Sequence, residues 1–138
     1  MFDVSLVVRD PTPDEARISA LLRESTTHKQ AKNHDAAIAC LREAYRLMEN
    51  VATIWSYKDW FRLPRCLHLA GRFGEAISEL QQLHDGLADY EARRACAGFV
   101  PMPKSVQANI RRLIKNEMAI TTEREAKAKK RADKKQPI

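Results

Sequence analysis

The chain has 138 residues, of which 44% are hydrophobic and 30% charged, a composition typical of a single globular domain. No apolar run in the sequence approaches the roughly 20 residues that a membrane helix needs, and the apolar run near the N-terminus lacks the basic leader of a signal peptide. Three cysteines without CxxC spacing favour reduced, buried thiols in a cytoplasmic protein.

Positive charge is concentrated at the C-terminal end. Residues 111–138 hold ten Lys or Arg against four Asp or Glu, and this difference of six equals the net charge of +6 of the whole chain. Residues 1–110 are therefore neutral overall, and the C-terminal segment makes the protein basic.

The first two predicted helices follow an N-terminal arm, residues 1–11. Thr12-Pro13-Asp14-Glu15 is a helix start, with Thr12 as the cap, proline in the first turn and Glu15 closing a capping box. One helix is predicted from there to about residue 32. A second is predicted from residue 35 to about residue 49, with its apolar residues at helical spacing.

Glycine and proline residues mark the ends and the kink of the next three predicted helices. A third helix is predicted from about residue 52 to 70, with a kink at Pro64, because proline lacks a backbone N–H and crowds the preceding turn. A fourth runs from about residue 74 to 97, and a fifth starts near residue 104. The apolar stripe of the fifth stops after Ile120, so residues 12–120 are expected to form the folded domain and residues 121–138 a basic tail that frays.

The segment from Ala70 to Leu80 is the most informative part of the sequence. A helix stops at a glycine, a tight turn follows, and a second helix opens on a small residue, Ala76; a weaker copy spans residues 32–41. In this pattern the chain resembles the tetratricopeptide repeat (TPR) family, whose helical hairpins have 34 residues. The residues that match the family's positions are Trp60, Gly71, Ala76 and Leu80 in one unit and Leu21, Ala37, Leu41 and Ala44 in the other.

The resemblance covers about residues 17–90 and implies an all-α fold. Together with the five helices predicted from the sequence pattern, it implies antiparallel hairpins stacked as a short right-handed array. The chain departs from the family pattern because its small-residue anchors, Ala37 and Ala76, are 39 positions apart and Pro64 replaces a small residue. We expect the fifth helix to cap the second hairpin; the alternative is a homodimer interface through residues 104–120.

The resemblance also implies a binding surface, because the first helix of each hairpin lines the concave face that holds a peptide in this family. Lys58, Arg62 and Arg65 recur at i, i+4 and i+7 and so share one helix face. Guanidinium groups bind carboxylates bidentately, which favours an acidic peptide or a free C-terminus as the partner. The alternative interpretation is a solvated face with ordinary charges. The candidate partner-binding residues are Lys29, Lys58, Phe61, Arg62, Arg65 and His68.

Aromatic side chains are concentrated in residues 55–61, the same part of the sequence as Lys58. Trp55, Tyr57, Trp60 and Phe61 are four of the nine Phe, Trp and Tyr residues of the chain. Aromatic residues are enriched at interfaces but also fill cores, and we favour core packing.

Catalytic and metal motifs are missing from the sequence. The four histidines form no i,i+4 pair and have no cysteine-rich knuckle beside them. Glycine-rich phosphate loops and GxSxG elbows do not occur either. We therefore predict a protein that is not an enzyme and that needs no metal or cofactor.

Three functions are consistent with these features. The first is an adaptor that binds a peptide or protein surface through its hairpins. The second is an accessory nucleic-acid-binding protein, because basic runs bind phosphate backbones by counterion release; the alternative interpretation of the tail is a solubilising helix end. The third is a self-associating structural subunit. The residues assigned to nucleic acid are Arg111, Arg112, Lys115, Lys127, Lys129, Lys130, Arg131, Lys134 and Lys135.

Overall fold

A computed structural model describes residues 12–51 and 55–135, so the N-terminal arm predicted at residues 1–11 lies outside the described residues. The described chain contains helices joined by short connections and no strand, which confirms the all-α class. Its helical segments are α1 (Pro13–Gln30), α2 (His34–Met48), α3 (Tyr57–Trp60), α4 (Arg62–Leu69), α5 (Phe73–Asp85), α6 (Leu87–Cys96) and α7 (Lys104–Lys135).

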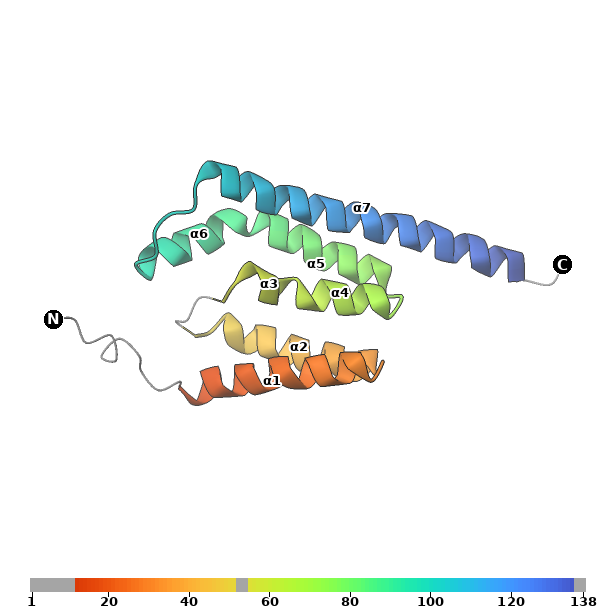
Figure 1. Cartoon of the computed structure of the whole chain (residues 1–138), viewed down its shortest axis with the longest axis horizontal. Coiled ribbons are helices and arrows are strands. Elements are labelled where there is room, and N and C mark those ends of the chain that lie inside the picture. Colours follow the sequence, from red (N-terminus) through yellow and green to blue (C-terminus); the bar gives the residue numbers. More distant parts are fainter. Residues whose placement is uncertain (1–11, 52–54, 136–138) are drawn as a thin grey trace.

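Helices α1 and α2 form an antiparallel pair (Figure 1). The predicted cap is present, since the Thr12 hydroxyl accepts a hydrogen bond from the Glu15 N–H at 3.2 Å. Asn33 caps α2 in the same way, by accepting from the Ala36 N–H at 3.4 Å. The facing apolar stripes of the two helices, with Ile18 and Leu41 fully buried, form one end of the main core.

The third predicted helix is divided into α3 and α4 at Phe61. Pro64 has no N–H to donate to the Trp60 carbonyl, four residues earlier, and its ring crowds that carbonyl. The Tyr45 hydroxyl enters the same gap: it donates to the Asp59 carbonyl at 2.6 Å and accepts from the Leu63 N–H at 3.1 Å. A side chain therefore replaces one bond of the helical ladder, and the helix is interrupted one turn before the proline.

The turn between α4 and α5 is tight. Gly71 has φ +78°, a conformation that favours glycine. The Gly71 N–H donates to the His68 carbonyl and the Arg72 N–H to the Leu67 carbonyl, the pattern of a Schellman helix end. Ala76 follows with no solvent exposure, in one cluster with Leu67 of α4.

The fourth predicted helix is also divided, into α5 and α6, at Gly86. Glycine is costly inside a helix because it has the most backbone freedom to lose. These two divisions explain why there are more segments than the predicted five.

Helix α7 lies along α5 (Figure 1). Ile114 is fully buried in a second apolar cluster with Phe61 and Leu80. The helix continues to Lys135, through the segment expected to fray, and its last turns project past the other helices.

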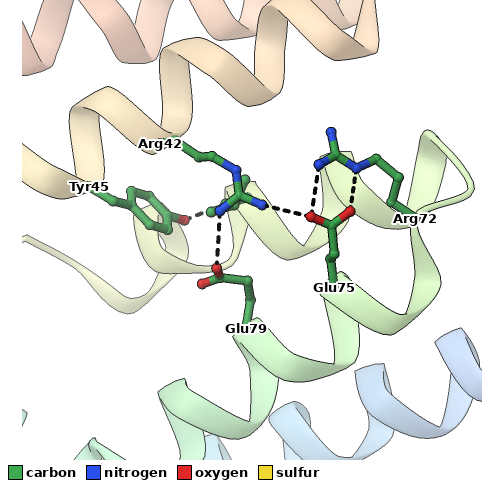
Figure 2. A network of polar contacts seen from close by, with 6 residues as sticks. Arg42, Tyr45, Arg72, Glu75 and Glu79 are labelled. Carbon is green, nitrogen blue, oxygen red and sulfur yellow. Dashed lines mark hydrogen bonds and ion pairs between the residues drawn. The ribbon is translucent and has the colours of Figure 1, made fainter.

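An ion-pair network joins α2 to α5 on the surface (Figure 2). Arg42 of α2 lies 3.3 Å from Glu75 and 3.5 Å from Glu79, and Arg72 also binds Glu75. The four side chains are 23–47% exposed, so water screens the charges and each pair contributes little stability, but together they join the two hairpins.

Candidate functional site

Helix α7 covers much of the surface that was expected to be an open groove. Phe61, only 7% exposed, packs under Ile114 of α7. The Arg65 guanidinium lies 3.5 Å from the Glu117 carboxylate, and His68 Nδ1 lies 3.0 Å from the Thr121 hydroxyl. Three of the six candidate residues therefore contact the chain's own C-terminal helix.

Of the other three candidates, Arg62 makes structural contacts, whereas Lys29 and Lys58 lie on the exposed surface. Arg62 pairs with Asp59 at 3.2 Å and donates to the Leu22 carbonyl and the Thr26 hydroxyl, both at 3.3 Å, so it fastens α4 to α1. Lys29 and Lys58 are exposed, and their ammonium groups make no hydrogen bond or ion pair within residues 12–51 and 55–135. The three cations of the predicted face thus do not act as one cluster.

A cleft does form nearby, where the α4–α5 turn meets α7, and we call it the basic cleft. It has three cations from α7, no acidic lining residue, and an apolar floor. Arg124 and Arg131 have no acidic partner among the described residues, while Lys127 pairs with exposed Glu123 at 3.1 Å. The lining residues are His68, Leu69, Gly71, Phe73, Arg124, Lys127, Ala128 and Arg131.

His68 is held in one orientation at the base of this cleft. Thr121 donates its hydroxyl hydrogen to the Glu117 carbonyl at 2.8 Å, so its oxygen accepts from His68 Nδ1–H, and Nε2 of the neutral ring is left as an acceptor. Burial lowers the pKa of His68, and the positive charge of Arg124 lowers it further, against an opposing effect of Glu117. The ring is therefore neutral at pH 7.

An exposed apolar ridge continues from the basic cleft along α7. It consists of Val106, Leu113 and Ile120, spaced seven residues apart and 39%, 56% and 46% exposed. Steps of four, seven and eleven residues from Ile120 reach Arg124, Lys127 and Arg131, so the cations lie on the same side of the helix. Leu69 of α4, 49% exposed, adds an apolar side chain from the neighbouring helix.

A second cleft lies between α2, α3, α5 and α6, and we call it the aromatic cleft. Four aromatic residues, three acids and one arginine line it. The concentration of aromatic residues at positions 55–61 was the sequence feature that could have indicated this cleft, but we interpreted those residues as part of the hydrophobic core. The lining residues are Tyr45, Glu49, Tyr57, Trp60, Glu79, Gln82, Leu83, Gly86, Asp89, Tyr90 and Arg93.

The residues assigned to nucleic acid are spread around α7. Arg111, Arg112, Lys115, Lys129, Lys130 and Lys134 are all exposed, and Lys129 pairs with Glu125 at 3.4 Å. The side chain of Lys135 lies outside the described part of the chain. The cations therefore do not form one stripe that follows a phosphate backbone.

The thiols are not all buried as expected. Cys66 is buried, Cys40 is half-buried and Cys96 is exposed near the end of α6. Burial raises the pKa of both Cys40 and Cys66. Over the part of the chain that the structure describes, no group of three or more His, Cys, Asp or Glu side chains is placed to hold a metal ion.

Comparisons with protein-family models, with curated proteins and with solved structures gave no match. Among the described helices, none combines the length and the apolar character needed to cross a membrane.

Proposed function

We propose that the protein is a non-catalytic, TPR-like adaptor that binds an acidic amphipathic segment of a partner protein along α7. The apolar side chains of that segment cover the exposed ridge, and its carboxylates enter the basic cleft. The observation that carries the proposal is the continuity of the two surfaces on one side of a single helix. This surface replaces the predicted groove, while the class of partner stays the same.

The chemistry of each half favours such a segment. Covering Leu113 and Ile120 removes apolar area from water at about 25 cal/mol per Å². Arg124 and Arg131 present guanidinium groups without acidic partners in the described chain, and these groups bind carboxylates in a fixed geometry. An acidic side chain meets no like charge from the residues that line the cleft.

A nucleic acid would satisfy only half of this surface. Phosphates pair with the cations but leave the apolar ridge in water. We therefore favour a protein partner and treat nucleic acid as the competing outcome.

A synthetic helical peptide tests the proposal by fluorescence polarisation. It has about 25 residues, enough for a helix to reach from Val106 to Arg131, with leucines at every seventh position and glutamates at one end. The double variant Arg124→Glu/Arg131→Glu should weaken binding at least about tenfold. The matched control Lys130→Glu/Lys134→Glu makes the same change in charge away from the cleft and should stay within about twofold.

Three results would contradict the proposal. Equal losses in both charge variants would indicate non-specific attraction between the basic helix and an acidic peptide. Unchanged binding in Leu113→Ser/Ile120→Ser would show that the ridge is not used. Tight binding of a DNA or RNA duplex that declines steeply with salt and is lost in both charge variants would favour the nucleic-acid function instead.

A further inference from the structure

The aromatic cleft offers a second recognition chemistry, lined by residues that the proposed function does not use. Its walls come from α2, α3, α5 and α6, and α7 does not line it. Two ring pairs contribute to the walls: Tyr45 with Trp60, centroids 4.7 Å apart, and Tyr57 with Tyr90, centroids 4.4 Å apart. The rings are held by one another and by hydrogen bonds, as Tyr45 bridges Asp59 and Leu63 and Tyr90 donates to the Trp55 carbonyl at 2.8 Å.

The cleft carries an excess of negative charge. Three carboxylates line it, those of Glu49, Glu79 and Asp89, against the single guanidinium of Arg93. The Glu79 carboxylate pairs with Arg42 at 3.5 Å, whereas the carboxylates of Glu49 and Asp89 have no ion pair or hydrogen bond within the described residues. Two carboxylates are therefore available for a positively charged ligand.

We infer that the aromatic cleft binds a small organic cation, a guanidinium or alkylated ammonium group. Aromatic faces attract such groups through the ring quadrupole, most strongly when water is displaced. Nearby carboxylates add charge attraction, so the combination selects a cation over a neutral group of the same shape. The cation is either a free molecule or the side chain of an arginine or alkylated lysine on a partner, because both sources present the same chemistry.

Tryptophan fluorescence tests this inference directly. Trp60 lines the cleft, and Trp55→Phe leaves it as the sole tryptophan. The buried Trp55 Nε1 has no hydrogen-bond partner among the described residues, so this background variant removes no such bond. Tetramethylammonium and N-methylguanidinium should each produce a saturable change in Trp60 emission, whereas tert-butanol, a neutral molecule of similar size, should not.

Charge variants test the role of the carboxylates. Glu49→Gln/Asp89→Asn should weaken binding of both cations at least about fivefold. Asp14→Asn/Glu24→Gln, which makes the same change in net charge on α1, should leave binding within about twofold. Three results would each overturn the inference. The first is an equal fluorescence response to tert-butanol and tetramethylammonium, and the second is no saturable response to any probe. The third is that Glu49→Gln/Asp89→Asn binds the cations as tightly as the Trp55→Phe background does.

A capped Gly-Arg-Gly peptide distinguishes the two sources of the cation. Binding at least about tenfold tighter than that of N-methylguanidinium identifies a partner's side chain as the occupant. Equal or weaker binding of the peptide identifies a free small cation. Arg124→Glu/Arg131→Glu should change neither result, so this inference and the proposed function can fail independently.

Discussion

At the scale of single residues, Tyr45 has the most specific role in the fold. Its hydroxyl bridges the Asp59 carbonyl and the Leu63 N–H, which are the acceptor and the donor of one helical hydrogen bond in an unbroken helix. The residue is 9% exposed, so loss of the hydroxyl leaves both backbone groups without a partner away from water. Burial also raises the pKa of the Tyr45 hydroxyl, which stays protonated and able to donate.

Tyr45→Phe should therefore lower the free energy of unfolding by about 1–3 kcal/mol, measured by urea denaturation. Tyr90→Phe is the control, because its hydroxyl makes one hydrogen bond at a half-buried position, to the Trp55 carbonyl. The free energy of unfolding should fall less in this control than in Tyr45→Phe. Equal losses would show that the hydroxyl of Tyr45 does not hold the junction of α3 and α4.

At the scale of helices, close approach of α4 and α5 depends on Ala76. Its side chain is fully buried in the main core with Leu67 and Cys66. Ala76→Leu should overpack this contact and lower the free energy of unfolding by about 1–3 kcal/mol. Ala39→Leu, at an exposed position of α2, is the matched control and should leave the thermal midpoint almost unchanged. An unchanged midpoint in Ala76→Leu would mean that the two helices do not pack closely.

The contact between α4 and α7 should respond to acid through His68. Because burial lowers its pKa in the folded state, the unfolded chain binds more protons over the interval between the two pKa values. The free energy of unfolding should therefore fall as the pH drops through the ordinary histidine range, from about 7 to about 5. Arg124 strengthens this effect and Glu117 opposes it.

His68→Gln removes the titrating ring, and its side-chain amide is still able to donate to Thr121. Urea midpoints measured across that pH range should decline less steeply in His68→Gln than in the wild type. His28→Gln, on α1, keeps the same number of histidines and serves as the control. If the urea midpoint of His68→Gln declined with pH as steeply as that of the wild type, a group other than His68 would cause the pH dependence.

At the scale of the whole molecule, α7 has a packed half and a projecting half. Ile114 is fully buried against Phe61 and Leu80, whereas residues 122–134 have no buried member. Ile114→Ala should cost about 2–5 kcal/mol, the usual range for truncating a buried isoleucine. Deletion of residues 122–138 should leave the urea midpoint almost unchanged. A large loss on deletion would show that the projecting half is docked on the core.

Periodicity and helix signals in the sequence were sufficient to predict the all-α class and the positions of α1 and α2. These features depend on short-range chemistry: the Thr12 cap, the Gly71 turn, and apolar residues three and four apart. The divisions at Phe61 and Gly86 were less visible, because one requires the Tyr45 hydroxyl from another helix and the other a glycine in an otherwise helical pattern.

The binding surface was decided by tertiary structure. The sequence identified Lys58, Arg62 and Arg65 as neighbours on one helix, and that spacing is a local property. Whether such a face stays open depends on where a helix some fifty residues later packs, and the Arg65–Glu117 and His68–Thr121 contacts join positions 52 and 53 residues apart. The all-α class, the turns and the basic C-terminal helix follow from local sequence. The covered groove and the two clefts exist only because long-range packing brings their walls together.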